Sequence, residues 1–209
     1  SNVAVGDLIG PEGSFVGALK RAGCVILGKT RTPEFANGGG RFAISSVRPT
    51  PWNPWDAETQ RVPGGSSSGS AVAVAAGLCA FAVGSDTGAS VRAPAALCGV
   101  FGLKTTAGLW PLDGVFPLSR SLDTLGILAR SAADAGIVLG AIAGSPPPDA
   151  PPPRSLRLGL PEPSFFFAGL DARVRACTDA ALDALRGAGV ELVPVAWPEV
   201  PQVGDHMAS

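Results

Sequence analysis

Residues 63–77 read PGGSSSGSAVAVAAG, a glycine- and serine-rich run that leads directly into small apolar residues. The run could be a flexible linker, but a linker is expected to join separate surfaces. Residues 71–80 are instead small and apolar all round, which predicts a helix buried among other elements. Glycines allow positive φ, and free amides at a helix start favour negative charge. We therefore expect a functional loop that opens into a buried helix.

A second run of small residues, GSDTGASVR at 84–92, follows the apolar residues Phe81 to Val83. These apolar residues predict a short buried strand. A tight turn at its end lets a serine hydroxyl and several backbone N–H groups face one point, as acyl transfer requires. The alternative is an ordinary turn in which Asp86 and Arg92 form a structural ion pair. Taken alone, the stretch favours the ordinary turn.

A serine nucleophile needs a group that removes its proton. The one histidine, His206, lies near the chain end, where residues are usually mobile, so we expect neither a Ser-His-Asp nor a Cys-His set. The remaining candidates are a carboxylate or a lysine whose pKa is lowered by burial. Lys29 ends the apolar stretch 24–27, a predicted strand, so it is the lysine most expected to be buried. Lys20 and Lys104 compete less well.

Lys29 also belongs to GCVILGKT at 23–30, which matches the phosphate-binding pattern G-x-x-x-x-G-K-[ST]. A phosphate-binding loop follows a strand and leads into a helix whose N-terminus faces the phosphates. Here a predicted helix comes first, the four variable residues are themselves a predicted strand, and Thr32-Pro33 follows. The order of elements is wrong, so we reject the nucleotide interpretation.

Helix followed by strand occurs twice, which indicates an α/β protein. Residues 12–28 combine a short helix, apolar on one side, with the strand 24–27. Residues 171–195 repeat this order, with Asp171 as the expected N-cap and glycines ending the helix before the strand VELVPV. A further apolar helix is predicted over 131–143.

Two other segments complete the predicted organisation. Residues 30–65 predict a long loop, and such loops are often functional. The segment SPPPDAPPP at 145–153 is interpreted as a surface connector within one fold, with a domain boundary as the alternative. A new strand, RLGL, is predicted after it.

The overall composition is that of a packed protein of 209 residues, 46% of them hydrophobic, with a formal charge of −1. No basic patch suggests a nucleic-acid or anionic-membrane partner, and we expect no cofactor or metal. No apolar run reaches the roughly 18 residues of a membrane span, and no signal peptide is evident, so a cytoplasmic location is expected. The widely spaced cysteines are predicted to be buried free thiols: Cys24, Cys79, Cys98 and Cys177.

Together these motifs resemble the amidase signature family of serine hydrolases. The resemblance covers nearly the whole chain and continues more weakly through RLGLPEPSFF and the helix and strand after it. It rests on ILGKTRTPEFANGG at 26–39, NPW at 53–55, PGGSSSGSAVAVAAG at 63–77, AVGSDTGASVRAPAALCGVFGLK at 82–104 and PLSRSLDTLGILARS at 117–131.

The resemblance implies α/β/α layers around a central mixed β-sheet, with residues 1–209 as a single domain that lacks N-terminal and C-terminal portions. It also implies a Ser-Ser-Lys set in which Ser90 is the nucleophile, Ser66 bridges from a cis peptide, and Lys29 is the base. Oxyanion donors would be the backbone N–H groups of Thr87, Gly88, Ala89 and Ser90. Ser67 would support this network, while Asp86 and Arg92 would hold the turn.

The implied reaction is hydrolysis of a small-molecule amide. Neutral Lys29 accepts the Ser66 proton while Ser66 takes that of Ser90, which attacks the amide carbon; Ser66 then protonates the leaving nitrogen, and water releases the acid. The sequence departs from the family at Ala89 and Ser68, where glycine is common, and at GLKTT, where GLKPT is more usual. The Ala89 methyl fits only if that residue avoids a glycine-only φ.

A homodimer is a candidate oligomeric state. Three alternative functions stay open. The chain could be the glutamine-hydrolysing subunit of a transfer-RNA-dependent amidotransferase, or a non-catalytic amidase fragment. It could also be a thiol hydrolase that uses Cys98, although no base is evident near that residue. A set of aromatic residues is predicted to serve mainly in the core, with an apolar substrate pocket as the alternative: Phe35, Trp52, Trp55, Trp110 and Phe116.

Overall fold

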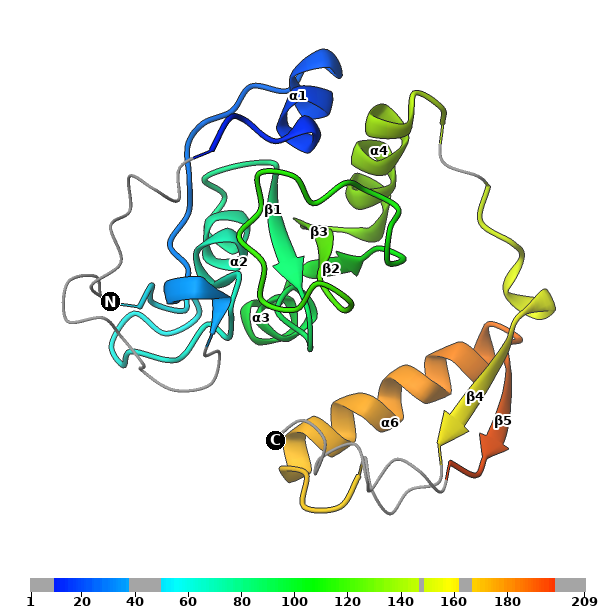
Figure 1. The fold of residues 1–209 in the computed structure, drawn as a ribbon. Helices are drawn as coiled ribbons and strands as arrows, with labels where there is room; N and C mark the ends of the chain where they lie inside the picture. Colours follow the sequence, from blue (N-terminus) through cyan, green and yellow to red (C-terminus); the bar gives the residue numbers. More distant parts are fainter. Residues whose placement is uncertain (1–9, 38–49, 147–148, 162–166, 198–209) are drawn as a thin grey trace. The chain divides into compact units, whose positions relative to one another are not determined.

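A computed structural model describes residues 10–37, 50–146, 149–161 and 167–197 (Figure 1). The chain divides into two compact units, Ser1–Pro147 and Pro148–Ser209. The division falls inside the predicted Pro-rich connector. No described helix is long and apolar enough to cross a bilayer.

The first unit is built on a three-stranded antiparallel sheet with the order β1-β3-β2. Its strands are β1 (Phe81–Asp86), β2 (Phe101–Lys104) and β3 (Thr124–Ala129). Every residue of β3 is buried, because β3 lies between the other two strands and carries the apolar run LGIL. Gly126 is needed in that run, since a Cβ there would lie 2.6 Å from the Leu103 carbonyl oxygen.

Helices cover both faces of this sheet, and alternate residues of β3 decide which face each cluster occupies. Leu125, Ile127 and Ala129 pack into one cluster with residues of α1 (Ser14–Arg21) and α4 (Ala132–Ala143). Leu128 packs into a second cluster with residues of α2 (Ser68–Ala75) and α3 (Arg92–Cys98). Ile127 and Leu128 are fully buried, and each contributes about 1.5–3 kcal/mol of apolar burial.

The second unit is a parallel β-α-β arrangement (Figure 1). Strand β4 (Arg157–Pro161) pairs with β5 (Glu191–Val195), and helix α6 (Ala172–Gly187) connects them. The Asp171 carboxylate accepts the Arg173 N–H at 2.8 Å, which confirms the predicted N-cap. Short 3₁₀ turns occur at Glu34–Ala36 and Pro153–Ser155.

The α/β class is confirmed, and most predicted elements form. The helix predicted over 71–80 begins earlier, at Ser68, and ends at Ala75, because Gly77 has a φ of +71°. The strand predicted at 81–83 continues to Asp86. In this chain the strands form two sheets, one antiparallel and one parallel. Strands β2 and β3 and the start of α3 lie in segments for which the sequence predicted no element.

The strand predicted at 24–27 is wrong. These residues form no described strand, and the side chains of Val25, Ile26 and Leu27 are 82%, 47% and 73% exposed. An apolar extended segment becomes a strand only when a neighbouring backbone accepts and donates its hydrogen bonds. Among the described residues no strand supplies those bonds, so the segment runs exposed from α1 to Lys29.

Candidate active site

The loop from Pro63 to Ser70 is buried and leads directly into α2, which argues against a linker between separate surfaces. Its Gly65–Ser66 peptide bond is cis, as the family resemblance implies. Gly64 has a φ of +80°, and a Cβ at this position would lie 2.8 Å from Pro94 Cα. The Ser68 hydroxyl donates to the Gly64 carbonyl at 2.6 Å. At this position, where the family commonly has glycine, the Ser68 side chain therefore forms a hydrogen bond within the loop.

This loop lies directly against the turn that carries Ser90. The Ser67 N–H donates to the Ser90 carbonyl at 3.0 Å, and the Ser67 hydroxyl donates to the Ser85 carbonyl at 3.3 Å. Gly84 permits this approach, since a Cβ there would lie 2.3 Å from Ser67 Oγ. Ser66 is 2% exposed, and its neighbour Ser67 is bonded to Ser90, so two of the three predicted catalytic residues lie on adjoining backbone.

Asp86 organises the turn as the predicted structural ion pair. Its buried carboxylate accepts from Arg92 Nε at 3.1 Å and from a terminal guanidinium nitrogen of Arg92 at 2.9 Å. It also accepts the backbone N–H groups of Val91 at 3.0 Å and Arg92 at 3.3 Å. Burial raises the pKa of Asp86, but these hydrogen bonds outweigh burial and hold the pKa below its ordinary value. Asp86 therefore holds the turn as a carboxylate.

The segment Thr87–Ser90 presents unpaired backbone donors. Among the described residues, no acceptor bonds to the N–H groups of Thr87, Gly88, Ala89 or Ser90. Ala89 has a φ of 148°, in the region that favours glycine. Its methyl group was expected to fit only if Ala89 avoided such a φ, and this expectation is not met. The Thr87 hydroxyl donates to Asp123, a residue that the motifs did not single out.

Lys29 precedes two residues that contact α2, but no hydrogen bond joins it to Ser66 in the described part of the chain. Thr30 and Arg31 contact α2, with 2.8 Å between the Thr30 and Ser70 hydroxyl oxygens and a 2.8 Å bond from the Gly69 N–H to the Arg31 carbonyl. Lys29 itself is exposed, and its side-chain nitrogen bonds to no described residue. The prediction that Lys29 is buried is wrong, because the expected strand before it lacks a partner that would cover it. The Ser66 and Ser90 hydroxyls likewise form no hydrogen bond with a described residue.

The predicted aromatic set divides between core and surface. Trp110 is buried and packs against Phe15 in a tilted arrangement with 4.8 Å between ring centroids. Trp52, Trp55 and Phe116 are exposed, contrary to the prediction of a core role. Phe35 and Phe116 contact each other, also at 4.8 Å.

The NPW motif has a structural role, because it caps the end of α3. The Asn53 side-chain amide donates to the Leu97 carbonyl at 2.7 Å, and the Trp55 indole donates to the Cys98 carbonyl at 2.7 Å.

The cysteines only partly match the prediction of buried thiols. Cys98 is buried, Cys24 and Cys79 are half-buried, and Cys177 is exposed because its side of α6 has no described cover. Burial raises the pKa of Cys98 to about 11. A thiol with such a pKa is a poor source of thiolate near neutral pH, which argues against the thiol-hydrolase alternative.

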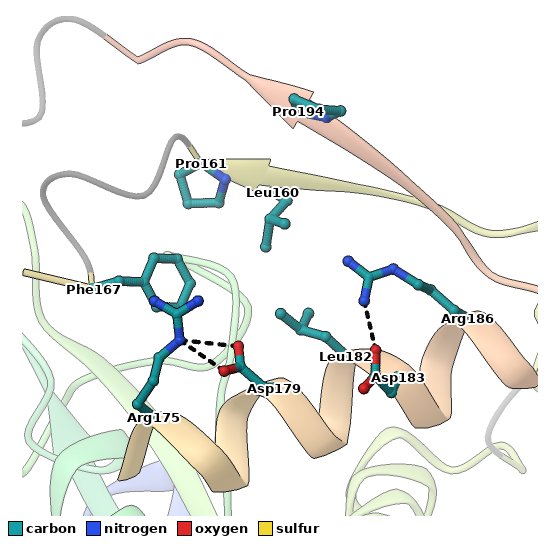
Figure 2. Close-up of a pocket in the computed structure, with 9 residues that line it drawn as sticks. All are labelled: Leu160, Pro161, Phe167, Arg175, Asp179, Leu182, Asp183, Arg186 and Pro194. Carbon is teal, nitrogen blue, oxygen red and sulfur yellow. Dashed lines mark hydrogen bonds and ion pairs between the residues drawn. The ribbon is translucent and has the colours of Figure 1, made fainter. Parts of the chain in front are cut away.

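The second unit contains a cavity of about 420 Å³ between α6 and the β4–β5 sheet (Figure 2). Its charges are already paired: Asp179 accepts from Arg175 at 2.9 and 3.0 Å, and Asp183 accepts from Arg186 at 2.7 Å. No predicted site residue lines it. The cavity is lined by Leu160, Pro161, Phe167, Arg175, Asp179, Leu182, Asp183, Arg186 and Pro194.

Comparison with known proteins gives matches along almost the entire chain. The model of a family described as Amidase matches residues 10–208. A 2-amino-5-chloromuconic acid deaminase of Comamonas testosteroni is 39% identical over 197 residues, which cover 92% of this chain and 42% of that protein. A subunit of the glutamyl-tRNA(Gln) amidotransferase of Roseiflexus castenholzii is 43% identical over 207 residues, covering 91% and 41%.

A solved structure agrees with these matches. The native peptide amidase from Stenotrophomonas maltophilia superimposes with a TM-score of 0.72 at 36% identity, covering 91% of this chain and 43% of that one. The chain therefore spans about two fifths of the length of the relatives it matches.

Proposed function

The chain belongs to the amidase family, and on that basis we propose that the protein hydrolyses the C–N bond of carboxylic amides through an acyl-enzyme on Ser90. The observation that carries the proposal is the row of N–H groups from Thr87 to Ser90 to which no described residue bonds. A tetrahedral intermediate needs such donors beside its nucleophile before charge develops. We refer to Thr87–Ser90 as the oxyanion loop.

The proposed steps use Ser66 as the proton carrier. Ser90 Oγ attacks the amide carbon while its proton passes to Ser66, whose own proton passes to Lys29. Ser66 then returns a proton to the leaving nitrogen, and the amine departs. Water attacks the acyl-enzyme through the same relay and releases the carboxylic acid. Lys29 acts in this relay as a neutral amine, since only an unprotonated amine can accept the proton.

The glutamine-hydrolysing component of an amidotransferase is the second candidate. It is favoured by the 43% identity to a protein named as part of a glutamyl-tRNA(Gln) amidotransferase. Both candidates use the same nucleophile, so they differ in substrate and partner. Ammonia release from glutamine only with the partner subunits present would support this second function, whereas release from simple amides by the protein alone would support the first.

An active-site serine probe tests the common chemistry and the inactive-fragment alternative. In the intact protein we expect a fluorophosphonate to label Ser90, and we expect Ser90→Ala to lose both labelling and amide hydrolysis. Ser145→Ala, at an exposed serine after α4, is the matched control and should keep both. Lys29→Ala should lower kcat by about a hundredfold or more if Lys29 is the base. Undiminished hydrolysis in Ser90→Ala would refute the proposal, and a well-folded protein that is never labelled would support the inactive fragment.

A further inference from the structure

Asp123 has a buried acidic side chain and takes part in no step of the proposed mechanism. It lies directly before β3, is 8% exposed, and contacts the oxyanion loop at Thr87. Its neighbour Thr124 pairs with Asp86 across the sheet, and the Thr124 hydroxyl donates to the Asp86 carbonyl at 3.0 Å. Side chains therefore reinforce the sheet at the point where the oxyanion loop leaves it.

The two oxygens of Asp123 accept from different segments. Oδ2 accepts the N–H groups of Leu118 at 2.9 Å and Ser119 at 3.0 Å, while Oδ1 accepts the Thr87 hydroxyl. The Asp123 N–H donates back to the Ser119 carbonyl at 2.9 Å, so residues 118–123 close around the carboxylate. Asp123 cannot turn away from Thr87 without giving up these other bonds.

We propose that Asp123 is a positioning residue for the oxyanion loop and that it acts through the Thr87 hydroxyl. The far end of the loop is already held, because Ser67 bonds to the Ser90 carbonyl and Asp86 bonds to the Val91 N–H. The Asp123 bond holds the near end, where Gly88 follows and adds no side chain of its own. Oxyanion donors act only when they are aimed in advance, and a misplacement of about 1 Å costs about a hundredfold in rate. This inference rests on the proposed function.

The test compares Thr87→Val with Thr87→Ser in the intact protein. Valine keeps the shape and the backbone N–H but removes the hydroxyl, so kcat should fall about tenfold to a hundredfold. KM should change less than about twofold, since the neutral substrate does not need the aimed donors. Serine keeps the hydroxyl and should restore most of kcat. The control is Thr105→Val, which removes a buried hydroxyl bond of 2.7 Å to the Leu125 carbonyl and should leave kcat unchanged.

A double-variant cycle connects the effect to Asp123. Asp123→Ala removes the oxygen that accepts from Thr87, so we expect a loss of kcat at least as large as in Thr87→Val. The double variant Asp123→Ala/Thr87→Val should lose no more than the worse single variant, because both changes break the same link. Additive losses would overturn the proposal, and so would a wild-type kcat in Thr87→Val.

The two variants separate the positioning role of Asp123 from hydrolysis through Ser90. Hydrolysis that persists in Ser90→Ala refutes the function itself. An inactive Ser90→Ala together with a fully active Thr87→Val refutes the positioning role alone. If Asp123→Ala does not fold, as thermal unfolding would reveal, the valine and serine variants at Thr87 still decide the question.

Discussion

Replacing Asp86 by alanine should be far more damaging to stability than removing its ion-pair partner Arg92. The Asp86 side chain is fully buried, whereas that of Arg92 is 50% exposed. Asp86→Ala leaves the N–H groups of Val91 and Arg92 without their acceptor, and each unsatisfied buried donor costs about 1–3 kcal/mol. With the broken ion pair added, we expect a loss of about 3–5 kcal/mol in the free energy of unfolding.

Arg92→Gln should cost only about 1–2 kcal/mol. Asp86 keeps its two backbone donors in this variant, and water can reach the place that the half-exposed guanidinium leaves. The control is Asp56→Ala, because Asp56 also accepts two backbone N–H groups and an arginine but lies at the surface with 27% of its side chain exposed. Asp56→Ala should lower the free energy of unfolding much less than Asp86→Ala does.

Urea unfolding of the intact protein, followed by circular dichroism at several pH values, measures these differences. The folded pKa of Asp86 lies below the unfolded value of about 3.9, so its contribution is fully present above about pH 4. The contribution is lost as the pH falls through the lowered folded pKa, and the deficit of Asp86→Ala should therefore shrink in acid. Equal losses in Asp86→Ala and Arg92→Gln, or a deficit that does not depend on pH, would refute the reasoning.

Three further predictions concern the first unit and one thiol from each unit. Ala89→Gly should stabilise the protein by about 0.5–1 kcal/mol in urea unfolding because it relieves a φ of 148°, whereas Ala96→Gly in α3 should destabilise it by a similar amount. Asn53→Ala should cost about 2 kcal/mol in the same assay, since it removes a buried cap from α3; a cost below about 0.5 kcal/mol would contradict that role. At pH 8, iodoacetamide should modify exposed Cys177 about a hundredfold faster than Cys98, whose pKa burial raises to about 11; mass spectrometry reads the rates, and equal rates would disprove the burial argument.

Local signals were enough to predict several elements. The helices α1, α4 and α6 carry their apolar spacing and their end signals within the segment itself, and Asp171 caps α6 as its position indicates. The sequence also predicted a functional loop at 63–70 and a tight turn at 84–92, but not that the two lie against each other. Their contact depends on small residues such as Gly84 that let Ser67 approach, and those residues are visible in the sequence.

The remaining features depend on contacts between residues far apart in the chain. Strand β3 is buried because β1 and β2 flank it, and Asp123 matters because the sheet places it beside Thr87, which lies 36 residues away. The apolar run at 24–27 shows the opposite outcome: its composition favours a strand, but no described neighbour pairs with it, and Lys29 stays exposed. Composition and spacing thus predicted the helices α1, α4 and α6 and the apolar strand before the turn at 87–90. Tertiary structure alone decided which segments are paired and buried, because hydrogen-bond partners and cover come from distant parts of the chain.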